Sequence, residues 1–151
     1  MKKRAAFILF VFNGILLCAG WAMVIVAYPK LPQKIPLWLD FFDQQHIMVK
    51  KSPLFFLYIL TQTLFFLLFF YLARKISSRI KASWEVEILK EYVYLTLIFF
   101  NLIFIHVQRS LILVAHQVEK GVDKLYFYSL FGIILILIPY FRLRKKSAQR
   151  L

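Results

Sequence analysis

The sequence predicts an all-α integral membrane protein, a bundle of four transmembrane helices in one domain (residues 1–151). Four apolar runs, 5–28, 53–73, 92–115 and 125–141, hold 24, 21, 24 and 17 residues, and a helix of about 17–25 apolar residues crosses the hydrocarbon core. Hydrophobic residues make up 62% of the chain, against roughly 45–50% in soluble domains. The chain shows no barrel pattern, so helices must satisfy its backbone hydrogen bonds in lipid.

The distribution of the net charge of +13 predicts the orientation. Thirteen Lys and Arg residues lie in the N-terminal tail, the second loop and the C-terminal tail, whereas six lie in the first and third loops. Basic residues in short loops favour the cytoplasmic side, so both termini are expected in the cytoplasm. We expect the basic side to contact anionic lipids at the cytoplasmic face rather than nucleic acid.

The first run is predicted to be a retained helix. It is longer than the roughly 7–15 residues of a signal-peptide core. Gly14, Cys18 and Ala22 repeat at every fourth position, and small residues on one face let two helices approach closely. Packing within the bundle and self-association are both open at this point. Asn13 lies beside this face and can form a hydrogen bond between helices.

The first loop is rich in proline, at positions 29, 32 and 36. Proline forbids a helix before Ile35. Apolar side chains then follow at helical spacing: Ile35, Trp38, Leu39 and Phe42. This pattern predicts a short amphipathic segment at the level of the headgroups, with Trp38 as its anchor. It would be a cover on the membrane surface or a contact for a ligand or partner.

The second loop predicts a cytoplasmic amphipathic segment, because apolar residues occur at every fourth position: Ile76, Ile80, Trp84 and Ile88. Ser83 followed by Glu85 and Glu87 is typical of a helix start. The third helix is therefore expected to begin near Trp84, before it enters the membrane around Tyr92.

The third run is the most polar of the four. Its side chains include a predicted intramembrane polar face: His106, Arg109 and His116. Ionisable residues within membrane helices are hypotheses for a functional site. The alternative is that Arg109, about 10 Å from the helix end, extends its guanidinium to the outer headgroups. Gln117 is turned from Arg109 to the same side as His106, and Asn101 and Gln108 are turned to the other side, so the polar arc covers roughly half of the helix.

The chain offers little for catalysis. The four runs contain no Asp or Glu, the four glycines are dispersed, and Cys18 is the only cysteine. A paired carboxylate, a phosphate-binding glycine loop and a cluster of metal ligands are all missing. The sequence therefore predicts a protein that is not an enzyme and that uses neither cofactor nor metal. A proton-coupled transporter is also disfavoured, because it needs an embedded carboxylate.

The first outer loop has a recognisable pattern of residues: Leu31, Pro32, Ile35, Pro36, Asp40 and Lys51. This pattern resembles the motif of the SdpI-type family of small multi-pass bacterial membrane proteins. The resemblance implies that the protein lies in the bacterial inner (plasma) membrane. Trp38 stands where the family usually has His, Asp43 where it has Gly, and Gln45-His46 where it has Pro-Asp. The resemblance implies a loop cap outside the membrane, with these residues at its centre: Pro32, Pro36, Trp38, Asp40, Phe42 and Lys51.

The resemblance also implies a function of the immunity or signal-transduction type, in which the cap recognises an external molecule. Asp40 or Asp43 would then pair with Arg109 or Lys51, since the outer side offers few other carboxylates. The alternative is a structural accessory subunit of a larger membrane complex, which would pack against other membrane proteins or a second copy. A transporter or lipid-handling role would need a polar path, which only the third helix offers.

Overall fold

The computed structural model describes residues 3–39, 47–80 and 83–149. Within them, four long helices follow one another: α1 (Lys3–Ala27), α2 (Leu57–Arg79), α3 (Ser83–Ala115) and α4 (Lys124–Gln149). Each is long and apolar enough to cross a membrane. This confirms the predicted all-α class with four helices that are able to span a membrane, and it fits an integral membrane protein.

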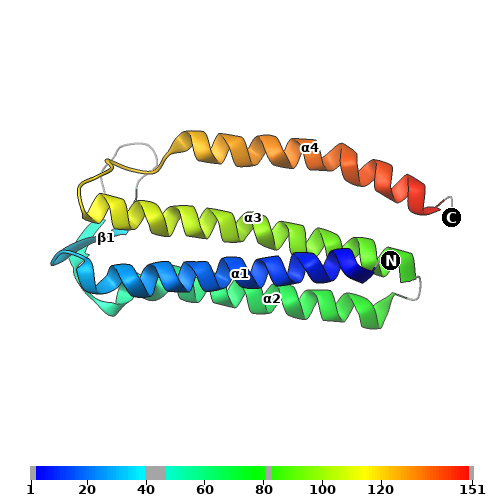
Figure 1. Ribbon diagram of the computed structural model, residues 1–151, viewed down its shortest axis with the longest axis horizontal. Helices are drawn as coiled ribbons and strands as arrows, with labels where there is room; N and C mark the ends of the chain where they lie inside the picture. Colours follow the sequence, from blue (N-terminus) through cyan, green and yellow to red (C-terminus); the bar gives the residue numbers. More distant parts are fainter. Residues whose placement is uncertain (1–2, 40–46, 81–82, 150–151) are drawn as a thin grey trace.

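The helices lie side by side along one axis, but not all are packed to the same extent. Helices α1, α2 and α3 contact one another along their lengths, whereas α4 packs against α3 and stands apart from the other two (Figure 1). Both chain termini lie at one end of the molecule, the terminal end. The strands lie at the opposite end, the hairpin end (Figure 1).

The buried core is concentrated at the hairpin end. It joins α1, the strands, α2 and α3 through apolar side chains: Val24, Leu31, Ile35, Leu39, Phe55, Ile59, Leu111, Val114 and Ala115. A smaller cluster near the terminal end contains Ala6, Ala73 and Tyr94. Large apolar side chains cover the outside of the helices, as a lipid environment requires.

The proline-rich loop is a β-hairpin, so the predicted helical spacing from Ile35 to Phe42 is wrong where the structure describes it. Strand β1 (Lys34–Trp38) pairs antiparallel with β2 (Ile47–Lys50), and Ile35 lies opposite Val49. Proline fixes φ and lacks an N–H, which disfavours a helix but is tolerated in a short edge strand. Residues 40–46, including Asp40 and Phe42, lie outside the described residues.

Two short 3₁₀ turns connect the hairpin to the helices. One, η1 (Tyr28–Lys30), follows α1, and the other, η2 (Pro53–Phe56), leads into α2. Both begin with a proline in the first turn, a position where the missing N–H costs nothing. The chain therefore leaves and re-enters the bundle abruptly, which holds the hairpin against the helix ends.

The predicted cytoplasmic amphipathic segment is not a separate element. Helix α2 continues to Arg79 and α3 begins at Ser83. Ile76 therefore belongs to the end of α2, Trp84 and Ile88 belong to the start of α3, and Ile80 follows the last residue of α2. The prediction that the third helix begins near Trp84 is confirmed. Helix α3 has 33 residues, about 50 Å of helix, so it extends well beyond a hydrocarbon core of about 30 Å.

Candidate functional site

The interior of the three packed helices contains a chain of four amide side chains. Asn13 comes from α1, Gln62 from α2, and Asn101 and Gln108 from α3, and each is at most 1% exposed. Gln108 Nε2 donates to Gln62 Oε1 (3.0 Å) and Gln62 Nε2 donates to Asn101 Oδ1 (2.9 Å). Asn101 Nδ2 in turn donates to Asn13 Oδ1 (2.8 Å). The three helices are therefore joined by polar contacts in a layer between the two apolar clusters.

The series of amide side chains ends on backbone carbonyl oxygens. Asn13 Nδ2 donates to the carbonyl oxygens of Leu9 and Tyr94. Gly20 makes the close approach of α1 possible, because a Cβ there would lie 3.0 Å from Gln62 Oε1. Hydrogen bonds between helices and small residues at their contacts hold membrane bundles together. These amides join the helices, and each of their polar atoms has at least one hydrogen-bond partner, except for Gln108 Oε1, which has none among the described residues.

The hairpin is fixed to the bundle by a lysine and a tyrosine. Lys51 Nζ donates to the carbonyl oxygens of Pro29 (3.1 Å) and Leu31 (3.0 Å). Tyr58 Oη, from α2, donates to the carbonyl of Leu37 (3.0 Å). Together with the buried face of the strands, these bonds make the hairpin a cap over the helix ends. Lys51 therefore donates to backbone carbonyls. Asp40 and Asp43, the predicted partners of Arg109 or Lys51, lie outside the described residues.

The exposed side of this cap carries apolar side chains beside two exposed lysines, Lys34 and Lys50. Trp38, Ile47 and Met48 are 55%, 58% and 46% exposed. Pro36, by contrast, is buried, and Pro32 is partly buried. Of the predicted cap residues, the prolines and Lys51 therefore shape the cap, whereas Trp38 is presented outward.

Beside the cap, a cavity of about 370 Å³ lies between the hairpin ends of α1 and α3. Basic side chains border it, from Lys30, Arg109 and His116. The rest of its lining is apolar, as with Met23 and Ile112. The cavity thus combines an apolar floor with a cationic rim, and it contains two of the three residues of the predicted polar face.

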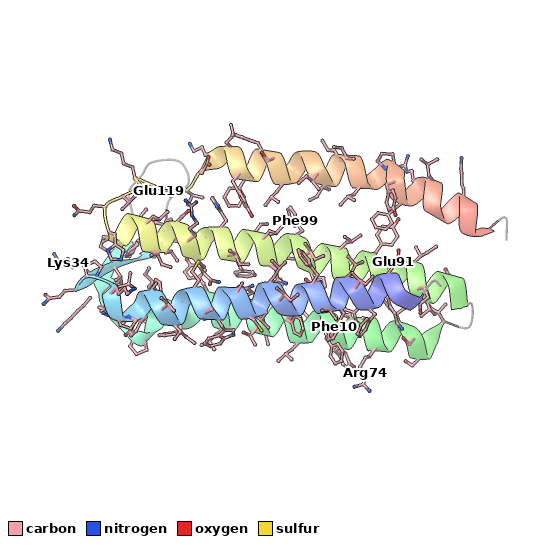
Figure 2. The ribbon with its side chains drawn as sticks, viewed as in Figure 1. Phe10, Lys34, Arg74, Glu91, Phe99 and Glu119 are labelled. Atoms are coloured by element: carbon pink, nitrogen blue, oxygen red, sulfur yellow. The ribbon has the colours of Figure 1, made fainter. Side chains whose placement is uncertain are left out.

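The turn after α3 brings a carboxylate to this rim. Gln117 has a positive φ of 59°, and Val118 N–H donates to the carbonyl of Leu113, a pairing typical of a helix end with a left-handed residue. The chain then doubles back, so Glu119 Oε1 lies 3.5 Å from Arg109 Nη2. Glu119 lies at the hairpin end, and the buried Glu91 lies toward the terminal end (Figure 2).

The third residue of the predicted polar face, His106, belongs to a different environment. Its buried ring stacks on Tyr126 of α4 at 3.9 Å, and Tyr126 Oη donates to the carbonyl of Leu102. These contacts attach the start of α4 to α3. The structure therefore separates His106 from the cavity where Arg109 and His116 lie.

The small residues of α1 point away from the other helices. A Cβ at Gly14 would meet nothing within 4 Å, and Cys18 and Ala22 are exposed. Packing within the chain uses Gly20 instead. Since this face does not pack within the bundle, a contact with a second copy or with another membrane protein would give it a function.

Gln62 was not identified from the sequence, and no partner was named for Asn13. A signal was present: a single amide in an otherwise apolar run must find a hydrogen-bond partner in lipid.

Within the described residues, no group of three His, Cys, Asp or Glu side chains is placed to hold a metal ion. Comparison of the chain with protein-family models, curated proteins and solved structures found no match.

Proposed function

We propose that this chain is a small non-enzymatic membrane protein that recognises an external molecule at its hairpin end, as an immunity or signalling protein would. The cavity between α1 and α3 carries the proposal. It places the guanidinium of Arg109, the imidazole of His116 and the ammonium of Lys30 around an apolar floor. The resemblance of the loop to the SdpI-type motif supports the same reading.

The chemistry of the cavity defines the ligand class. A cationic rim over apolar walls fits a molecule with an anionic group and an apolar part. The Arg109 side chain is 54% exposed despite its contact with Glu119, so an incoming carboxylate or phosphate can reach it. The exposed apolar side chains of the cap, Trp38, Ile47 and Met48, lie at the same end of the molecule and would extend the contact with the ligand.

The proposal requires the hairpin end to face outward, in agreement with the excess of basic residues at the terminal end. Labelling with a membrane-impermeant maleimide in intact cells tests this. In a Cys18→Ser background, His116→Cys should react from outside, whereas Ser78→Cys near the end of α2 should react only after permeabilisation. The reverse pattern would place the cavity in the cytoplasm and end the proposal.

Binding at the cavity is tested by a photo-crosslinking amino acid placed at Ile112, on the cavity floor. The matched control is the same amino acid at Ile15, an exposed position in α1. We expect a distinct non-lipid adduct from position 112 that disappears in an Arg109→Gln background. If both positions give only lipid adducts, the cavity does not recognise a separate molecule.

A second candidate is a structural accessory subunit of a larger membrane complex. The uncovered small-residue face of α1, Gly14, Cys18 and Ala22, favours it. Purification from native membranes in mild detergent, with mass spectrometry of stoichiometric companions, separates the two. A large complex that is lost in Gly14→Val would support the subunit. A chain that runs alone would exclude it.

A further inference from the structure

An apolar groove of about 430 Å³ runs between α3 and α4. Its walls include Tyr92, Leu95, Phe99 and Leu102 from α3, and Ile133 and Leu137 from α4. Phe99 lies between the two helices (Figure 2). The volume is within the range of about 300–1,000 Å³ that is usual for small-molecule sites.

Two aromatic contacts join α3 and α4, and the groove lies between these two contacts. Near the terminal end, the rings of Tyr92 and Phe141 lie 3.9 Å apart. Toward the hairpin end, His106 stacks on Tyr126, also at 3.9 Å. Side chains between these contacts do not fill the space, so the groove is a fixed feature of the way α4 is attached.

The groove is about as long as one leaflet of a membrane is thick. Tyr92 and Leu102 are ten residues apart on α3, about 15 Å at 1.5 Å per residue. That is half of a hydrocarbon core of about 30 Å. A partner helix with a diameter of about 10–12 Å would have to continue past the aromatic contacts at both ends. A single acyl chain, by contrast, ends near the midplane.

Cationic side chains mark the headgroup level of the same leaflet. Arg142 directly follows Phe141, and Lys146 lies one turn further along α4; both are exposed. Lys90 lies two residues before Tyr92 on α3 and is partly buried. Basic residues at this depth attract anionic lipid headgroups.

We propose that the α3–α4 groove binds one anionic phospholipid from the leaflet at the terminal end. One acyl chain lies along the groove between Tyr92 and Leu102, and the phosphate contacts Arg142 with support from Lys90. This site is separate from the cavity at the hairpin end and does not depend on the external ligand. The lipid would serve as the packing partner that α4 lacks on this side.

Native mass spectrometry of the full chain in mild detergent tests the proposal, with added phosphatidylglycerol or phosphatidylcholine. We expect one phosphatidylglycerol molecule to be retained in preference to phosphatidylcholine. Arg142→Gln should reduce that preference about fivefold, the factor that corresponds to roughly 1 kcal/mol for each basic residue near an anionic surface. Arg74→Gln, an exposed arginine on α2, should leave it unchanged.

A pair of tryptophan variants tests the place of the acyl chain. Ile133→Trp fills the groove and should abolish retention of the lipid, whereas Ile136→Trp, at a position 72% exposed and outside the groove lining, should not. Equal retention of the two lipids by the unmodified chain would overturn the proposal without need of any variant. So would equal behaviour of Arg142→Gln and Arg74→Gln, or a groove occupied by a second copy of the chain.

Discussion

Replacement of Asn101 by leucine should be among the most destabilising single changes in the bundle. Asn101 sits in the middle of the amide chain, where it accepts a hydrogen bond from Gln62 and donates one to Asn13. Leucine has nearly the same shape, so the change removes hydrogen bonding without opening a cavity. It leaves Gln62 Nε2 and Asn13 Oδ1 without the partners that they have here.

The size of the effect follows from these two losses. Hydrogen bonds between membrane helices average about 0.6 kcal/mol in bacteriorhodopsin, which for two bonds sets a lower limit near 1 kcal/mol. Two buried polar groups left unpaired, at about 1–3 kcal/mol each, set an upper limit near 6 kcal/mol. We expect Asn101→Leu to reduce the free energy of unfolding by an amount between these limits.

Gln108→Met is the matched control, at the end of the same chain. It leaves Gln62 Oε1 without its donor, but it also removes Gln108 Oε1, a buried acceptor that has no partner among the described residues, so one unpaired acceptor replaces another. The free energy of unfolding should therefore fall by less than about 1 kcal/mol.

Unfolding by sodium dodecyl sulfate in mixed micelles, followed by tryptophan fluorescence, measures both variants. Trp21 is a suitable reporter because its indole N–H donates to Thr63 Oγ1 across α1 and α2. If Asn101→Leu costs no more than Gln108→Met, the amides do not act as a connected chain.

Two further predictions concern single positions. Gly20→Val should destabilise the folded monomer, because the new side chain meets Gln62 at about 3 Å, whereas Gly14→Val should leave monomer stability within about 0.5 kcal/mol; a similar loss of stability in both would contradict the assigned packing face. Lys51→Met should release the hairpin by removing two charge-assisted hydrogen bonds, at about 1.5–3 kcal/mol each, and limited proteolysis should cut the hairpin faster than in the exposed-site control Lys50→Met. Equal cleavage rates would show that Lys51 does not hold the cap.

The four helices could be predicted because lipid imposes a simple rule: long apolar runs become helices. The hairpin could not, because Ile35, Trp38 and Leu39 happen to match helical spacing. Burial of Ile35 and Leu39 against the helix ends depends on contacts far along the chain. A local pattern of four side chains does not contain that information.

The packing face of α1 shows a second limit of prediction from the sequence. Gly14, Cys18 and Ala22 form the more obvious series, yet the buried positions of α1 include Asn13, Gly20 and Val24. Small residues permit close packing without requiring it, whereas an amide in lipid requires a partner. The polar residue was therefore the better guide to the buried face, although its partners on α2 and α3 could not be read from the sequence.

The interior polar layer of this bundle is built from carboxamides, and a carboxamide is neutral at every physiological pH. A membrane voltage exerts force on charge, about 2.3 kcal/mol per elementary charge for each 100 mV. Asn13, Gln62, Asn101 and Gln108 carry none, so neither depolarisation nor acidification of one compartment acts directly on the bonds between these helices. The hydrogen bonds that join α1, α2 and α3 are thus independent of both membrane voltage and pH. A direct response to either must arise at other side chains, such as Arg109 and Glu119 at the hairpin end or His106 between α3 and α4.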